Sequence, residues 1–233
     1  MAKLPKRFRL PKLKPPKPRN GPSLRDELWN LPNILTYGRV LLIPVVMYYL
    51  GKCTTGADPT SVDRDSRLYS FIATCLFSLA AITDFLDGWI ARNWNLGTML
   101  GRFLDPLADK LIVTACLVML VELGRTPAWL VILLLARELS VTSLRSMASS
   151  EGLEVAVSQG GKWKTAFQLI GLVGLLTHYS YPVVFWGLGT WACDFNLVGN
   201  LLLGGSMIFS ISSAIEYFYR FAVAAASHDH AHR

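Results

Sequence analysis

Four aspartates stand in two closely spaced pairs, and they are the residues of this sequence best suited to chemistry. Asp84 and Asp87 are three positions apart, and Asp105 and Asp109 are four apart. Residues at these spacings share one face of a helix. An aspartate inside a membrane helix costs at least about 2.5 kcal/mol on insertion scales. Two such pairs beside apolar stretches therefore indicate a functional site.

The chemistry that four carboxylates favour is metal binding. About a dozen residues connect the two aspartate stretches, so their helices are expected to be antiparallel neighbours whose acids converge. Converging carboxylates need cations between them, and oxygen ligands without His or Cys suit Mg²⁺ or Mn²⁺. We expect two divalent cations about 4 Å apart that clamp a pyrophosphate for displacement at phosphorus. The alternative is salt-bridged helix ends, with Asp105 capping a helix that begins at Pro106.

The aspartates also belong to a longer pattern with eight defined positions. It reads Asp84-x-x-Asp87-Gly88-x-x-Ala91-Arg92, then eight residues, then Gly101-x-x-x-Asp105-x-x-x-Asp109. This pattern resembles the signature of the CDP-alcohol phosphatidyltransferase family. The resemblance implies a six-helix membrane fold, a homodimer, and a metal-bound CDP site that opens to the cytoplasm.

The resemblance also implies roles for individual residues. Asp84, Asp87, Asp105 and Asp109 would hold the metals, and Asp109 would in addition be the catalytic base toward the acceptor hydroxyl. The residues expected to shape the CDP-diacylglycerol pocket are Gly88, Ala91, Arg92 and Gly101. Arg92 also brings a fork-shaped donor that suits phosphate.

Further cations follow on the same predicted side and bear on the acceptor. Arg137 and Arg145 lie near one face of a helix, and Lys162 opens the next apolar stretch. They indicate an acceptor with its own phosphate, whereas Lys164 could equally be an ordinary flanking charge. These stretches, with Leu31–Thr36 and Arg39, resemble the phosphatidylglycerophosphate synthases of the family. The expected substrates are CDP-diacylglycerol and glycerol 3-phosphate, and the expected products are phosphatidylglycerophosphate and CMP.

The elements that must position these residues are apolar helices. The chain of 233 residues is 52% hydrophobic and 17% charged, against about 25% charged in soluble domains. Several stretches reach the roughly 20 residues that cross a bilayer. We predict an all-α membrane protein with six transmembrane helices, over residues 31–50, 68–91, 104–123, 127–147, 163–187 and 197–225.

The positive charges predict the orientation. Nineteen of the 23 Lys and Arg lie on the side that holds the N-terminus, which is typical of a cytoplasmic face. Residues 1–28 form a basic, Pro-rich arm expected to lie on anionic headgroups. The catalytic domain is expected over residues 29–226 and a disordered tail over 227–233. We expect an integral protein of a bacterial, mitochondrial or plastid inner membrane, with membrane lipid and no nucleic acid among its partners.

Two kinds of alternative stay open. Within the family, the product could be cardiolipin, phosphatidylserine or a phosphatidylinositol phosphate, because the signature specifies the donor and not the acceptor. Outside it, four aspartates could form the ion site of a cation transporter, although their clustering at one membrane face argues against a pathway. A disulfide between Cys53 and Cys193 is conceivable, since both fall in loops on the outer side.

Overall fold

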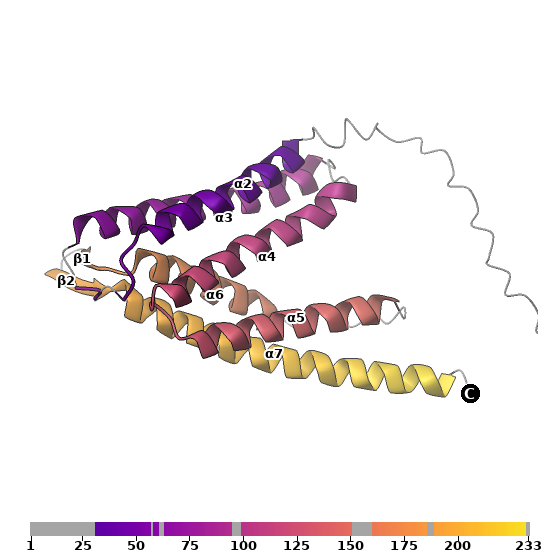
Figure 1. Cartoon of the computed structure of the whole chain (residues 1–233). Helices are drawn as coiled ribbons and strands as arrows, with labels where there is room; N and C mark the ends of the chain where they lie inside the picture. Colours follow the sequence, from indigo (N-terminus) through magenta and orange to yellow (C-terminus); the bar gives the residue numbers. More distant parts are fainter. Residues whose placement is uncertain are drawn as a thin grey trace, which may run out of the picture.

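The computed structural model is a bundle of long helices with a β-hairpin at one end (Figure 1). The structure describes residues 31–56, 58–60, 63–94, 99–150, 160–185 and 189–231. For some of these residues it describes the backbone alone, namely 31–32, 85–94, 99–103, 160–162, 183–185, 189–191 and 224–231. The basic arm therefore lies outside the described residues. The helices are α2 (Leu31–Gly51), α3 (Arg64–Trp94), α4 (Met99–Glu122), α5 (Ala128–Ser150), α6 (Gly160–Thr177) and α7 (Phe195–Ala231).

Three of these helices contain a segment long and apolar enough to cross a membrane. The segments are Asn33–Gly51 of α2, Arg64–Asp84 of α3 and Phe195–Val223 of α7. Many large apolar side chains on them are exposed, such as Leu41, Phe71 and Ile208 at 56–72%. In a membrane these surfaces would contact lipid, so the all-helical membrane class predicted from the sequence agrees with the structure.

The fifth apolar stretch is not one long span, which corrects the prediction. Helix α6 ends at Thr177, and His178 follows with φ 62°. This left-handed conformation turns the chain before Pro182. Strands β1 (Ser180–Phe185) and β2 (Gly189–Asp194) then form an antiparallel hairpin that the sequence analysis did not anticipate.

Two further boundaries and the cysteines also differ from expectation. Helix α7 continues to Ala231, beyond the domain end expected at residue 226, and α4 begins at Met99 with Pro106 inside it. Asp105 is thus not the N-cap of a helix that begins at Pro106. All four cysteines are free, so Cys53 and Cys193 form no disulfide.

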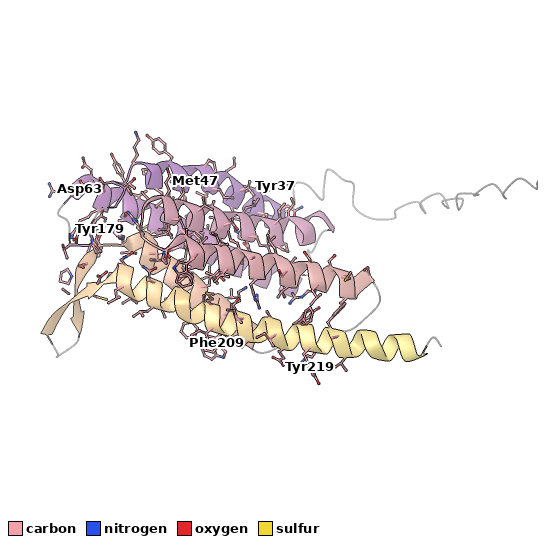
Figure 2. The ribbon with its side chains drawn as sticks, turned by 60° about the horizontal axis from the view of Figure 1, so that its bottom comes forward. Tyr37, Met47, Asp63, Tyr179, Phe209 and Tyr219 are labelled. Atoms are coloured by element: carbon pink, nitrogen blue, oxygen red, sulfur yellow. The ribbon has the colours of Figure 1, made fainter. Side chains whose placement is uncertain are left out.

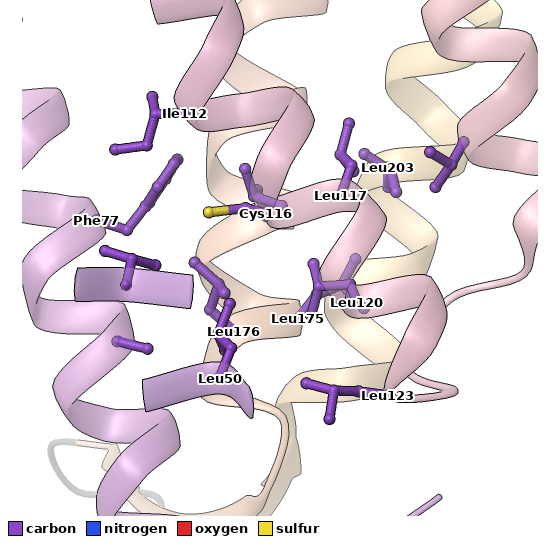
Figure 3. Packing of buried hydrophobic residues seen from close by; sticks show 14 of the residues in the cluster. Leu50, Phe77, Ile112, Cys116, Leu117, Leu120, Leu123, Leu175, Leu176 and Leu203 are labelled. Atoms are coloured by element: carbon purple, nitrogen blue, oxygen red, sulfur yellow. The ribbon is translucent and has the colours of Figure 1, made fainter. Parts of the chain in front are cut away.

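The hydrophobic core lies in the half of the bundle that adjoins the hairpin. Leucines from α4 and α6 interdigitate there with Leu50 of α2, Phe77 of α3 and Leu203 of α7 (Figure 3). The core members on α4 and α6 include Leu117, Leu120, Leu175 and Leu176, each fully buried. This packing holds the helices together at one end and leaves polar groups at the other.

A buried arginine closes the hairpin end of the bundle. Gly124, with φ 70°, ends α4 in a Schellman motif in which the Arg125 amide donates to the Leu120 carbonyl. The Arg125 guanidinium donates to the Leu176 carbonyl at 3.1 Å and to Ser70 Oγ at 2.7 Å. It thereby caps the C-terminus of α6, where a cation is favourable. Tyr179 and Asp63 mark the same end in Figure 2.

Candidate active site

One buried polar face of α2 organises the opposite end of the bundle. Asn33, Thr36 and Arg39 follow one another at three-residue steps, so they lie along one side of the helix. They are only 1–2% exposed, although the helix around them is apolar. Buried polar groups in such surroundings require partners. For Thr36 and Arg39 these partners are aspartates of α3 and α4.

Arg39 joins the two predicted aspartate pairs. Its Nη1 lies 3.0 Å from Asp84 Oδ1 on α3 and 2.6 Å from Asp109 Oδ1 on α4. The guanidinium is 1% exposed, whereas the two carboxylates are 41% and 42% exposed. The cation therefore lies beneath the acids, and the acids remain accessible from the open side.

Thr36 makes the second link between α2 and the aspartates. Its hydroxyl donates a hydrogen bond to Asp105 Oδ1 on α4. Asp105 and Asp109 are one helical turn apart on α4, and Thr36 and Arg39 are about one turn apart on α2. Two successive turns of α2 therefore contact two successive turns of α4. The polar face of α2 thus contacts three of the four predicted aspartates, Asp84 and Asp109 through Arg39 and Asp105 through Thr36.

The other predicted donor-site residues fall outside what the structure describes in detail. The backbone of α3 carries Asp87, Gly88, Ala91 and Arg92 on its last turns, and α4 carries Gly101 in its first turn. Their side-chain environments lie outside the described residues. The same holds for Lys162 at the start of α6.

The donor set at this end fits a hard divalent cation in its chemistry. The described acids are carboxylates from two helices, and carboxylate oxygen is the ligand that Mg²⁺ and Mn²⁺ prefer. Among the described side chains, which exclude Asp87, no three acidic, His or Cys groups are close enough to bind an ion together. A complete metal site would therefore need Asp87 in addition to Asp84, Asp105 and Asp109.

A cluster of cations surrounds Glu138 of α5, and one of these cations, Lys110, follows Asp109 directly on α4. Lys164 of α6 donates to Glu138 Oε2, and Lys110 of α4 lies 3.9 Å from Glu138 Oε1. Arg137 Nη1 lies 3.4 Å from Oε2. One carboxylate thus gathers three cations from α4, α5 and α6 and leaves the cluster with net positive charge.

Lys164 is not an ordinary flanking charge, because it is 8% exposed and paired with Glu138. Arg137 has a second attachment, since its Nε donates to the Ser210 carbonyl of α7 at 2.8 Å. Arg145, two turns further on, is exposed and places its guanidinium 5.9 Å from the ring centroid of Tyr217. Arg137 and Arg145 both contact α7.

An open surface depression of about 490 Å³ lies along the C-terminal half of α5. Its lining consists of Thr142, Ser143, Ser146, Met147 and Ser150. Lys110 reaches its edge, because Lys110 Nζ donates to Thr142 Oγ1 at 2.8 Å. The Lys110 contact connects this hydroxyl-lined surface of α5 to the cationic cluster around Glu138.

The sequence analysis missed the site roles of four of these residues. It assigned no role to Lys110 or Glu138, and it named Thr36 and Arg39 only within stretches that resemble the phosphatidylglycerophosphate synthases. Arg39 did carry a signal of its own, since an arginine two turns inside a membrane helix is costly and usually functional. The spacing of residues along the sequence could not show which carboxylates Arg39 contacts.

Comparisons with known proteins identify the family of this chain. The family model for CDP-alcohol phosphatidyltransferase matches residues 29–211. The chain is 37% identical over 201 residues to the Bacillus subtilis protein named CDP-diacylglycerol–glycerol-3-phosphate 3-phosphatidyltransferase, covering 82% of this chain and 94% of that one.

Two plant proteins are also similar. An Arabidopsis thaliana protein, named as the chloroplastic/mitochondrial form 1 of the same transferase, is 39% identical over 65% of this chain and 52% of its own. A rice protein named cardiolipin synthase (CMP-forming) is 37% identical over 64% of this chain and 46% of its own. The match over residues 29–211 includes all four signature aspartates, and the chain belongs to the CDP-alcohol phosphatidyltransferase family.

Proposed function

We propose that this protein transfers the phosphatidyl group of CDP-diacylglycerol to sn-glycerol 3-phosphate, and so forms phosphatidylglycerophosphate and CMP. The observation that carries the proposal is the convergence of Asp84, Asp105 and Asp109 on one face of α2. The relatives named for this reaction support the choice of acceptor, since the Bacillus subtilis protein aligns along nearly its whole length.

The reaction is a single displacement at phosphorus. The 1-hydroxyl oxygen of glycerol 3-phosphate bonds to the β-phosphorus of CDP-diacylglycerol, and the bond from that phosphorus to the bridging oxygen of CMP breaks. Asp109 accepts the proton of the hydroxyl. The buried Arg39 positions Asp109 for this step, because its Nη1 lies 2.6 Å from Asp109 Oδ1.

Asp84, Asp87, Asp105 and Asp109 would hold two divalent cations, Mg²⁺ or Mn²⁺. When bound, these ions supply positive charge to the pyrophosphate and to the leaving CMP. In this proposal the CDP-diacylglycerol donor binds beside Gly88, Ala91, Arg92 and Gly101. Helices α3 and α4 carry these residues at the same end of the bundle as the aspartates.

The acceptor phosphate would bind among the cations beside Glu138. Arg137, Arg145 and Lys162 were the residues expected to hold it, and the structure adds Lys110 and Lys164 as candidates. Glycerol 3-phosphate carries close to two negative charges at neutral pH. The position of Lys110 next to Asp109 in α4 would let the phosphate bind while the distal hydroxyl reaches the base.

We further propose that six helices cross the membrane and that the protein acts as a homodimer. Helix α2 begins and α7 ends at the aspartate end of the bundle, opposite the hairpin (Figure 1). Both ends would face the cytoplasm or its equivalent, as the excess of Lys and Arg on that side indicates. A bacterial inner membrane or an organelle inner membrane fits the relatives, which include bacterial and plant proteins.

An acceptor assay tests the proposed function directly. Purified protein in detergent receives CDP-diacylglycerol, Mn²⁺ or Mg²⁺, and one radiolabelled acceptor at a time: glycerol 3-phosphate, phosphatidylglycerol, serine, inositol or inositol phosphate. We expect lipid-soluble product and stoichiometric CMP only with glycerol 3-phosphate. Product from phosphatidylglycerol alone would favour cardiolipin synthesis, for which the rice relative is named. Ion flux without CMP release would favour a transporter.

A further inference from the structure

Arg39 has a position that the reaction itself does not explain. It is 2% exposed, it comes from α2, and the family signature lies entirely on α3 and α4. Its Nη1 contacts carboxylate oxygens of Asp84 and Asp109 at 3.0 and 2.6 Å, so a single nitrogen bridges two helices. Both carboxylates belong to the proposed metal site.

Two cations that share the same acids must oppose each other. Asp84 and Asp109 repel one another as like charges, and the guanidinium between them offsets that repulsion. A divalent ion bound to these oxygens, at a typical distance of about 2.1 Å, would lie within a few ångströms of the guanidinium. Repulsion between a monovalent and a divalent cation at such a separation changes affinity by about tenfold even at the dielectric constant of water.

We propose that Arg39 is a built-in counter-cation of the metal site. Its buried charge holds Asp84 and Asp109 together in solution without divalent cations, and the same charge weakens the binding of those cations. The inference rests on the metal part of the proposed function and does not depend on the acceptor. Arg39 is thus a positioning residue that keeps the acids assembled and the metals exchangeable.

The first test replaces the charge while the size stays similar. Full-length wild type and Arg39→Gln are purified in detergent, Mn²⁺ binding is measured from the signal of free Mn²⁺ by electron paramagnetic resonance, and melting is followed in EDTA and in saturating Mn²⁺. We expect Arg39→Gln to bind Mn²⁺ about tenfold more tightly. Its melting temperature should fall by about 5–10 °C in EDTA and by much less in Mn²⁺, because loss of a buried partner is costly only while the acids lack another cation.

Arg125→Gln is the matched control. Arg125 is equally buried, at 2% exposed, but it lies at the hairpin end, where it contacts the Leu176 carbonyl and Ser70. Its replacement should lower the melting temperature equally in EDTA and Mn²⁺ and leave Mn²⁺ affinity unchanged. Equal or weaker Mn²⁺ binding by Arg39→Gln, with the same melting loss in both solutions, would reduce Arg39 to a structural residue and overturn the proposal.

If Arg39→Gln does not fold, the same measurements on Arg39→Lys test the proposal. Lys retains the charge without the fork, so Mn²⁺ affinity should stay within about threefold of wild type while melting in EDTA falls. Tenfold weaker binding by the Lys variant would contradict a role as counter-cation. Wild type that binds no Mn²⁺ at all would overturn the metal site together with this inference, whereas an error in the acceptor would leave every one of these measurements unchanged.

Discussion

At the scale of single residues, the site separates a buried cation from accessible acids. The Arg39 guanidinium is 1% exposed, yet the carboxylates of Asp84 and Asp109 are about two-fifths exposed. The carboxylates thereby neutralise the buried Arg39 charge, which would be costly to bury without a partner. The open side of each carboxylate remains available to a substrate hydroxyl or a metal ion, as a site for phosphoryl-type transfer requires.

The role of Asp109 as base can be tested at the same scale. Asp109→Asn keeps the shape of the side chain and removes its capacity to accept a proton. We expect kcat to fall by about 10² to 10⁴-fold, with a much smaller change in the apparent affinity for CDP-diacylglycerol. Steady-state kinetics with varied donor, together with donor binding by the variant, measure the two effects separately.

Asp63→Asn is the control for that substitution. Asp63 lies at the hairpin end, where Ser66 and Thr54 donate hydrogen bonds to it and hold its pKa below the usual value. Its replacement should leave kcat unchanged. Lost donor binding with an unaltered rate in Asp109→Asn would instead identify Asp109 as a metal ligand that does not act as the base.

How far the sequence predicts this site depends on the distance between partners along the chain. The pairs Asp84 with Asp87 and Asp105 with Asp109 follow from helical spacing, because partners one turn apart need no knowledge of the fold. The contacts of Thr36 and Arg39 span about 70 residues and depend on which face of α2 meets α4. Tertiary packing decides that face, and periodicity within one helix cannot reveal it.

At the scale of elements, α6 packs closely on α7, and these two helices support the cations proposed to bind the acceptor phosphate. A Cβ added at Gly199 would lie 2.7 Å from the Leu175 amide nitrogen and 2.9 Å from the Gly171 carbonyl oxygen. Glycines on both helices thus allow a backbone approach that larger residues would prevent, as is common between membrane helices.

Gly199→Ala should therefore destabilise the bundle. The new methyl group would collide with backbone atoms of α6, which cannot move as a side-chain tip can, and overpacking of this kind costs about 1–3 kcal/mol. Thermal unfolding in detergent measures the loss. Gly204→Ala on the same helix is the control, because an added Cβ there meets nothing within 4 Å. Equal melting temperatures for the two variants would contradict the close approach.

The helix ends were harder to predict than the helices. The apolar run through β1 resembles a continuing span, because Tyr181, Val183 and Phe185 are as apolar as a helix interior. The turn at His178 depends on contacts with segments far away in the chain, such as the Ser180 amide bond to the Pro59 carbonyl at 3.0 Å. Local pattern predicts where a helix can form, and distant contacts decide where it stops.

The acceptor pocket also belongs to the scale of elements, because Arg137 connects α5 to α7 through the Ser210 carbonyl. Arg137→Ala should raise KM for glycerol 3-phosphate by roughly 10 to 150-fold, the value of a lost charge-assisted hydrogen bond. KM for CDP-diacylglycerol should change far less. Arg220→Ala, which removes an exposed cation paired with Glu216 on α7, is the control and should change neither constant. A lower melting temperature with unchanged KM values would mean that Arg137 only ties the helices together.

At the scale of the whole molecule, the two ends of the bundle are built for different tasks. The hairpin end is held by the buried Arg125 and by leucine packing, whereas the other end gathers the aspartates and the Glu138 cluster. Rigid packing at one end holds the helix ends at the other in register. In the proposed topology, the catalytic end would face the compartment that supplies the water-soluble acceptor and receives CMP.

This polarity predicts a topology that can be measured on intact membranes. Single cysteines are introduced at Asp58, in the connection before α3, and at Ser150, at the end of α5, into a variant without the four native cysteines. Both positions are exposed. A membrane-impermeant maleimide should label the Ser150 variant only from the cytoplasmic side and the Asp58 variant only from the opposite side, since an odd number of spans would separate them. Labelling of both positions from one side would contradict six spans with a cytoplasmic catalytic end, whatever the acceptor of the reaction.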